Sequence, residues 1–259
     1  MVIIKTAEQV EGIRKSCKLL AKVMEELVKA AQPGVTPKEL NEIAEEMIVT
    51  NGGLPAFKGY RAGPATTPFP TGLCASLNDI VVHGPATSEI ALKDGDILGM
   101  DLGIDLNGYF SDMAKTVTIG QVDQKIQKLV DVTRESLSNG IKQMAPGVKI
   151  RQISQAIEDT IRPHGFGIVR EFVGHGVGIE VHEDPRIPNY VSESMRDDLE
   201  IELEPGMVLA IEPMLTAGSE DVDILNDGWS VKTRDKSLAA HFEHTVLVTD
   251  SGHEILTKL

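Results

Sequence analysis

The residues best suited to chemistry in this sequence are acids that stand inside apolar segments. Asp101 ends the apolar run ILGMD, and Asp112 lies in the segment that follows. Asn107-Gly108 between them predicts a two-residue hairpin turn, because both turn positions require φ > 0. In such a hairpin Asp112 faces Gly103 and shares a face with Asp101, which puts the two carboxylates roughly 5–8 Å apart. Gly103, which has no side chain, would leave room between them.

An isolated carboxylate beside a core is costly, so two such acids share a proton, pair with cations or hold a metal. The alternative is a surface hairpin with solvated acids. Glu212 in VLAIEPML and Glu243 in HFEHTVLV occupy similar apolar settings. His175 and His182 lie in GHGVGIEVH, where the glycines disfavour a helix and let the backbone approach a ligand.

Four carboxylates and one imidazole form a hard, oxygen-dominated ligand set. Such a set suits a pair of divalent first-row ions, bridged by a carboxylate, better than a closed structural zinc site. Two metal ions ~3.5–4 Å apart activate water and polarise a carbonyl, which is the chemistry of metal-dependent hydrolases. An EF-hand is excluded because its first and last ligand positions would be Gly103 and Ala114. A serine nucleophile is not supported, because no G-x-S-x-G elbow occurs.

The composition narrows the class of protein further. A net charge of −14 and a pI near 4.9 argue against a nucleic-acid or anionic-membrane binder. Two cysteines make no disulfide framework, and neither a signal peptide nor a membrane-spanning run is present. We therefore expect a cytoplasmic protein.

The elements that must position these residues can be read from capping and periodicity. Amphipathic spacing predicts a helix over 6–31, and the capping box Thr36-Pro37-Lys38-Glu39 opens a second helix over 36–50. The Pro- and Gly-rich stretch 54–72 predicts a loop. The remaining expectations are strand and turn over 73–83, the hairpin over 97–119, helices over 122–145 and 149–163, and strand and loop to the end.

The order of these elements contains an internal repeat. Residues 20–35 and 129–148 are each a helix ending in Pro-Gly-Val, and 95–101 and 206–212 are each a strand ending in an acid. A second acid-bearing strand follows in both cases. We therefore expect one catalytic domain over 1–259, with related halves over about 6–120 and 121–255 whose four carboxylates converge.

The chain resembles the type I methionine aminopeptidases of the short bacterial form. The short spacing between His182 and Glu212 is similar to type I, since type II enzymes carry a helical insertion there. The resemblance implies a monomer with the α+β pita-bread fold, which has two pseudo-two-fold halves, a curved antiparallel sheet and outer helices. The matching stretches are PAFKGY (55–60), LCASLNDIVVHG (73–84), LKDGDILGMD (92–101), FVGHGVGIEVHEDP (172–185), LEPGMVLAIEP (203–213) and DGWSVKTRDKSLAAHFEHTVLVTD (227–250).

By position, the resemblance implies two divalent ions per chain, of cobalt, manganese, iron or zinc, with a bridging hydroxide. Asp112 and Glu243 would bridge the ions, and Asp101 would hold the ion that receives the substrate amine. Glu212 would also be the general base. His182 would contact the scissile carbonyl, and His83 the peptide beyond it. The implied metal ligands are Asp101, Asp112, His175, Glu212 and Glu243.

The resemblance also implies a pocket for a methionine side chain. The alternative for its aromatic residues is ordinary core packing. Residues 61–68, RAGPATTP, are similar to an insertion beside the pocket wall, and Phe172 departs slightly from common family forms. The residues expected around the methionine side chain are Tyr60, Phe69, Cys74, Phe172 and Trp229. Asp105, Glu180 and Glu183 are expected to be solvated.

The implied activity is removal of the initiator methionine from nascent polypeptides. The N-terminal methionine of such peptides would be the partner, with the ribosome as a further one, and neither nucleic acid nor membrane is expected. One alternative is a proline-specific peptidase of the same fold, although those enzymes usually carry an additional N-terminal domain. The other is a non-catalytic binding protein that kept the fold.

Overall fold

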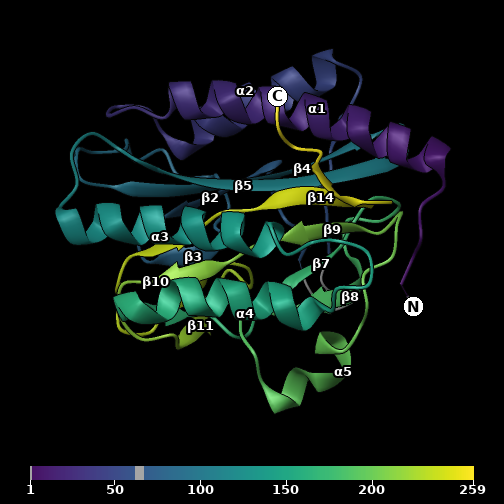
Figure 1. Ribbon diagram of the computed structural model, residues 1–259. Coiled ribbons are helices and arrows are strands. Elements are labelled where there is room, and N and C mark those ends of the chain that lie inside the picture. The colour runs from purple at the N-terminus through teal and green to yellow at the C-terminus, as the bar shows by residue number, and fades with distance from the viewer. Residues whose placement is uncertain (1, 62–66) are drawn as a thin grey trace.

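The computed structural model describes residues 2–61 and 67–259, in a mixture of helices and antiparallel strands (Figure 1). Residues 62–66, most of the expected insertion, lie outside the described residues. The helices are α1 (Ala7–Ala30), α2 (Pro37–Thr50), α3 (Gln124–Ile141), α4 (Ile150–Ile161), α5 (Arg196–Leu199) and the 3₁₀ turns η1 (Arg162–His164) and η2 (Glu193–Met195). The strands are β1 (Leu54–Pro55), β2 (Leu73–Leu77), β3 (Ile80–Val82), β4 (Ile97–Leu106), β5 (Tyr109–Thr118), β6 (Gly167–Ile168), β7 (Gly174–Gly176), β8 (Glu183–Ile187), β9 (Val208–Ile211), β10 (Met214–Thr216), β11 (Val222–Ile224), β12 (Val231–Thr233), β13 (Ala239–His241), β14 (His244–Thr249) and β15 (Gly252–Ile255).

The first half of the chain is a helix pair packed on the sheet formed by β1, β4, β2 and β5. Helix α2 begins at the expected capping box, with Thr36 as the N-cap residue, and α1 begins at a second capping box, at Thr6, which was not expected. Leu27 of α1 and Leu40 of α2 belong to one buried cluster with Leu102 of β4. Burial of this apolar surface stabilises the layer at about 25 cal/mol per Å².

The second half repeats this layering with other residues. Helices α3 and α4 pack closely because Gly140 of α3 leaves space for the side chain of Ile157 of α4. Ile157 shares a buried cluster with Leu209 of β9 and Val246 of β14. The main sheet of this half has the order β15-β14-β9-β7-β8. None of the helices in the described part of the chain is long and apolar enough to cross a membrane.

The acid-bearing hairpin has the expected register, with Asp112 opposite Gly103. Its turn residues Asn107 and Gly108 have φ values of 58° and 82°, as a type I′ turn requires. The expectation that Gly103 leaves room between the two carboxylates was wrong, however. A Cβ at this glycine would lie 2.7 Å from Cε1 of Phe57, so the missing side chain accommodates that ring rather than leaving a gap between the acids.

The two halves meet along β5 and β14. The amide of Asp112 donates to Oγ1 of Thr245 (3.1 Å), and that hydroxyl donates to the Asp112 carbonyl (2.7 Å). The amide of Glu243 donates to the carbonyl of Ala114 (2.9 Å). The assignment of one catalytic domain with a duplicated ancestor stays a prediction. Short elements differ from expectation: β1 lies in the expected loop, and η2 and α5 lie where strand and loop were expected.

Candidate metal centre and active-site pocket

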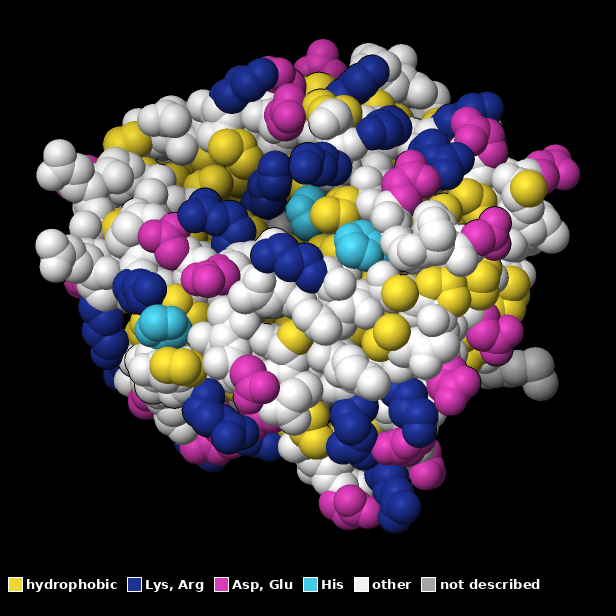
Figure 2. All heavy atoms as spheres, in the orientation of Figure 1, with side chains coloured by type: hydrophobic (Ala, Val, Ile, Leu, Met, Phe, Trp, Pro, Cys, Tyr) yellow, Lys and Arg dark blue, Asp and Glu magenta, His cyan; other side chains and the backbone are white. Residues whose placement is uncertain are grey.

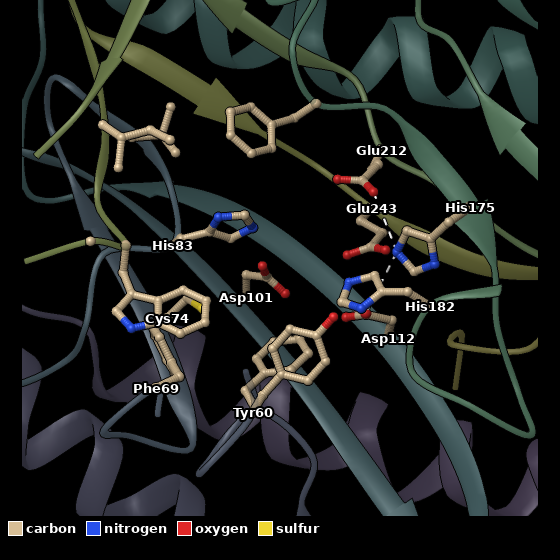
Figure 3. Close-up of a pocket in the computed structure, with 16 residues that line it drawn as sticks. Tyr60, Phe69, Cys74, His83, Asp101, Asp112, His175, His182, Glu212 and Glu243 are labelled. Carbon is tan, nitrogen blue, oxygen red and sulfur yellow. Dashed lines mark ion pairs between the residues drawn. The ribbon is translucent and has the colours of Figure 1, made fainter. Parts of the chain in front are cut away.

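The five expected metal ligands come from five neighbouring segments. Asp101 and Asp112 lie on β4 and β5, and His175 lies on β7. Glu212 directly follows β9, and Glu243 directly precedes β14. Antiparallel pairing of β7 and β14 with the two sides of β9 sets His175 and Thr245 opposite the same residue, Ala210. The strand registers therefore bring distant parts of the sequence to one place (Figure 3).

The ligand atoms of these residues are close enough to share metal ions. Those of Asp101, Asp112 and Glu243 all lie within 4.8 Å of one another, and so do those of His175, Glu212 and Glu243. Glu243 belongs to both groups. Nε2 of His175 lies 3.4 Å from Oε1 of Glu212 and 3.9 Å from Oδ2 of Asp112.

Burial shifts the proton affinities of these groups in the absence of metal. It raises the pKa of Asp101 to about 7 and that of Glu212 to about 8. Burial, followed by repulsion from the neighbouring acids, raises the pKa values of Asp112 and Glu243 well above their usual range. Burial lowers the pKa of His175 to about 3, so this imidazole is neutral at physiological pH and its nitrogen can act as a ligand.

The surroundings fit divalent cations. Within the described residues, no Lys or Arg side chain forms an ion pair with the four acids, and Asp101 Oδ1 and Glu243 Oε1 are buried without a hydrogen-bond partner. Nδ1 of His175 donates to the carbonyl of Gly176 (2.9 Å), which leaves Nε2 unprotonated and directed at Asp112 and Glu212. Fixing the other ring nitrogen in this way is how proteins orient a histidine ligand.

Two residues beside this site were not expected from sequence. His241 is buried, and its Nε2 lies 3.3 Å from Oε2 of Glu212 without a hydrogen bond from the described residues. Asn189 donates from Nδ2 to the carbonyl of Glu212 (3.1 Å). The i, i+2 spacing of His241 and Glu243 in HFEHTVLV is the signal that could have identified the histidine, because alternate residues of an extended segment share a face. No local signal distinguishes Asn189.

The same acids lie at one end of a cavity of about 290 Å³. The cavity gathers every residue expected in the catalytic, metal-binding and substrate-binding sets (Figure 3). Its lining also includes Phe57, Ile224, Gly228 and Val231, which were not expected there. The expected residues in its lining are Tyr60, Phe69, Cys74, His83, Asp101, Asp112, Phe172, His175, His182, Glu212, Trp229 and Glu243.

Aromatic rings and two histidines shape this cavity. The ring of Phe69 meets that of Trp229 edge-on at a centroid distance of 5.2 Å, and Tyr60 lies 6.4 Å from the same tryptophan. His182 is exposed at the cavity, 4.5 Å from His175 between ring centroids. His83 has a φ of 59° directly after β3, and burial lowers its pKa to about 4.

The expectation that Glu183 is solvated was wrong. Its carboxylate is buried in an ion pair with Lys5, with each side chain only 1% exposed. The other oxygen, Oε1, accepts from the amides of Ile179 (2.6 Å) and Glu180 (3.1 Å). Burial became possible because Lys5, far away in sequence, supplies the opposite charge. Asp105 serves the turn instead, accepting from the amide of Gly108 (2.7 Å).

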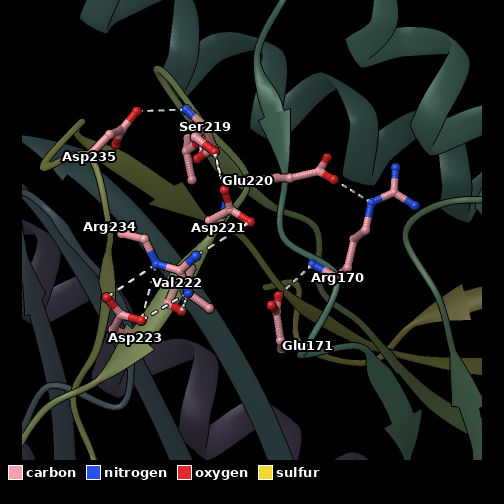
Figure 4. A network of polar contacts seen from close by, with 10 residues as sticks. Arg170, Glu171, Ser219, Glu220, Asp221, Val222, Asp223, Arg234 and Asp235 are labelled. Atoms are coloured by element: carbon pink, nitrogen blue, oxygen red, sulfur yellow. Dashed lines mark hydrogen bonds and ion pairs between the residues drawn. The ribbon is translucent and has the colours of Figure 1, made fainter.

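A charged network lies beside β11 and β12 (Figure 4). Arg170 donates from Nε to Glu220 (2.8 Å), and Arg234 donates from Nη2 to Asp223 (3.0 Å). Asp223 directly precedes Ile224, which lines the cavity. The acids that complete the network are Glu171, Asp221 and Asp235.

Comparison with known proteins identifies the class. Residues 11–250 match metallopeptidase family M24. The methionine aminopeptidase of Borreliella burgdorferi is 46% identical over 257 residues, which are 99% of this chain and 98% of that protein. The solved methionine aminopeptidase of Thermotoga maritima matches with a TM-score of 0.93 and 40% identity over 100% of both chains. The prolidase of Pyrococcus furiosus matches with a TM-score of 0.77 and 25% identity, covering 99% of this chain and 66% of that one.

The chain therefore belongs to metallopeptidase family M24 and has the pita-bread fold. Within that family it groups with the methionine aminopeptidases, as the resemblance predicted. It is a metallo-aminopeptidase, a hydrolase that removes an N-terminal methionine.

Proposed function

We propose that this enzyme removes the initiator methionine of newly made polypeptides with two divalent ions, in the cytoplasm and as a monomer. We infer that residues 1–259 act as one catalytic domain, because each half supplies part of the ligand set. The observation that carries the proposal is the convergence of five ligand residues at one end of an aromatic cavity. The two overlapping groups of ligand atoms, which share Glu243, support a pair of ions.

The residues that would hold the ions are Asp101, Asp112, His175, Glu212 and Glu243, with Asp112 and Glu243 between the two positions. When bound, such ions lower the pKa of water and polarise a carbonyl oxygen. The ligand set suits manganese, iron, cobalt and zinc alike. Asp101 would belong to the position that receives the free amine of the substrate.

The protein side chains would then move protons and stabilise charge. Glu212 takes a proton from the attacking water and returns it to the leaving amine as the peptide bond breaks. His182, which is exposed at the cavity, donates a hydrogen bond to the oxygen of the scissile carbonyl as negative charge develops there. His83 lies among the same lining residues and contacts the peptide beyond the cleaved bond.

The aromatic part of the cavity would hold the methionine side chain. Tyr60, Phe69 and Trp229 form connected ring contacts, and Cys74 belongs to the same buried cluster. Phe172 closes the other side, against His83 at a centroid distance of 5.2 Å. A thioether fits such a pocket because its polarisable sulfur makes favourable contacts with ring edges.

The closest alternative is cleavage next to proline. The described fold is shared with prolidase, but this chain covers only 66% of the Pyrococcus furiosus enzyme, and the relatives matched over full length are methionine aminopeptidases. Rates on Met-Ala-Ser and on Ala-Pro decide between the two activities. Faster cleavage of Ala-Pro would overturn the proposal. A purely binding role is disfavoured, because the complete ligand set converges.

The proposed role of Glu212 is tested by Glu212→Gln. Loss of a general base lowers rates by about 10²–10⁴-fold, so methionine release from Met-Ala-Ser should nearly cease. The circular dichroism spectrum should remain unchanged, and the metal content should be measured for each variant. Glu220→Gln, which alters an exposed ion pair with Arg170, is the matched control and should retain activity. Full activity of Glu212→Gln with two bound ions would rule out the proposed role.

A further inference from the structure

A second cavity, of about 560 Å³, opens between helices α1 and α3, and we call it the helix-side cleft. Apolar residues line it, among them Met113, Leu137 and Phe242, each less than 10% exposed. Figure 2 shows a hollow on this face with Lys, Arg and His side chains around it. The mechanism proposed above uses none of the residues that line it.

This cleft lies behind the metal centre. Successive residues of a strand point to opposite faces. Met113 and His244, which line the cleft, directly follow the expected metal ligands Asp112 and Glu243. The cleft and the active-site cavity share no lining residue within the described chain. A molecule in the cleft would therefore contact the reverse side of the strands that position the metal ligands.

Cations are gathered around the cleft, although the whole chain carries a net charge of −14. Four of them line it, namely Lys115, Arg134, Lys142 and Lys258. Among the described residues of the lining, Glu25 has the only acidic side chain. The cleft is thus a locally basic site in an acidic protein, and this charge complements an anion.

The side chains of two of these cations form no hydrogen bond or close ion pair with the described residues, although the charge of Glu25 acts on Lys115 at longer range. Within the described residues, neither Lys115 nor Lys258 donates a side-chain hydrogen bond or forms an ion pair, whereas Arg134 pairs with Asp131 and Lys142 donates to Asn139. Lys115 is half-buried, and burial lowers its pKa. A bound anion would compensate this partly desolvated ammonium group.

We propose that the helix-side cleft binds a small organic anion. Its apolar body packs on Met113, Leu137 and Phe242, and its carboxylate, phosphate or sulfonate group is bound by Lys115 and Lys258. The cavity volume lies within the range of about 300–1,000 Å³ that is usual for small-molecule sites, which combine an apolar lining with a few polar groups. A flat basic surface without such an apolar cavity would instead suit an extended polyanion.

Binding of naphthalene-1-sulfonate to the Zn²⁺-loaded enzyme tests this proposal. The probe has an apolar body and a sulfonate group, which is a poor metal ligand, and excess methionine keeps the active-site cavity occupied. ¹³C-methyl labelling of the nine methionines gives a local signal at Met113, which Met113→Leu assigns. We expect that resonance to shift and then saturate as naphthalene-1-sulfonate is added, at every concentration of methionine.

The charge requirement is tested with the neutral naphthalene-1-sulfonamide and with a double variant, Lys115→Met with Lys258→Met. Each change should weaken binding about tenfold, as expected for the loss of one to two charge pairs. Lys128→Met, on the exposed side of α3, is the matched control and should bind like the wild type.

The absence of a saturable Met113 shift, equal affinity for the sulfonamide, or loss of the shift when methionine is added would overturn the proposal. Equal binding by the double variant would do so as well. The sulfonamide comparison uses the wild-type protein, so it decides the question even where the double variant folds poorly.

Discussion

Protons and metal ions compete for the same acids at the metal centre. Without metal, burial raises the pKa of Asp101 to about 7 and that of Glu212 to about 8, so both are largely protonated below pH 7. Metal ligands must be deprotonated, so metal binding displaces these protons. At pH 9, above both values, the two groups are largely ionised in the metal-free protein, so they release fewer protons when metal binds.

We therefore expect metal-free protein to release about one proton per chain, or more, when it binds Zn²⁺ at pH 6.5. The number released at pH 9 should be smaller. Calorimetric titration in buffers of different ionisation enthalpy measures this number. In Asp101→Asn the release at pH 6.5 should be smaller, because one of the two carboxyls has been removed. A binding enthalpy that is independent of the buffer at pH 6.5 would contradict the expectation.

The surroundings of some residues could be predicted from the sequence, and those of others could not. Asp101 and Asp112 could be placed together because the Asn107-Gly108 turn fixes a local register. The surroundings of Glu183 could not be inferred, because its burial depends on Lys5, whose position is determined by tertiary packing. The position of His241 beside Glu212 is known only from the fold, which brings the two residues together.

At the scale of elements, the segment before α1 is tied to the loop that carries His182. The amide of Lys5 donates to the carbonyl of Gly206 (2.9 Å), and its ammonium group pairs with Glu183 at the start of β8. Glu183 in turn accepts from the amides of Ile179 and Glu180. This pair therefore orders the loop that ends at His182.

We expect Lys5→Met to lower the free energy of unfolding by about 3–5 kcal/mol, because it leaves a buried carboxylate without its partner. Adding Glu183→Gln should recover part of this loss, since the amide oxygen still accepts from the loop and carries no charge. Urea unfolding of the single and double variants measures the coupling. Lys29→Met, which breaks an exposed pair with Glu26, is the control and should leave the free energy of unfolding close to that of the wild type, because solvent screens exposed ion pairs.

If the pair positions His182, kcat on Met-Ala-Ser should fall in Lys5→Met even where the variant is fully folded, and Lys5→Arg should restore part of it. A kcat equal to that of the wild type would show that the pair contributes to stability alone.

Elements with a local signal were predictable from sequence, and others were not. Amphipathic spacing predicted the start of α1 and the capping box at Thr36 predicted the start of α2, each to within one residue. β1 and α5 were missed because they are only two and four residues long, so no periodicity could mark them. The pairing of β7 and β14 with the two sides of β9 is a tertiary contact that no local pattern specifies.

At the scale of the whole molecule, each half is incomplete as a metal site. Asp101 and Asp112 come from the first half, and the remaining ligands come from the second. The two largest buried clusters lie under different helix pairs, one under α1 and α2 and the other under α3 and α4, and a smaller cluster joins Ile13 and Cys17 of the first half to Val208 and Leu247 of the second. A metal ion held by both halves therefore stabilises their association as well as each sheet. A ligand at 100 times its dissociation constant adds about 2.7 kcal/mol to the free energy of unfolding.

Metal loading should therefore protect both buried clusters together. We expect Zn²⁺ to slow hydrogen exchange in α1 and in α3 by similar factors, and to move a single thermal transition upward. Asp101→Asn removes a ligand from the first half only, so it should reduce the metal-induced protection of α3 in the second half as well. Asp123→Ala, at the N-cap of α3, is the control, because it removes the side-chain cap on the amide of Ile126 and weakens that helix locally without changing its response to metal. Protection confined to the half that carries the unaltered ligands would show that the halves bind metal independently.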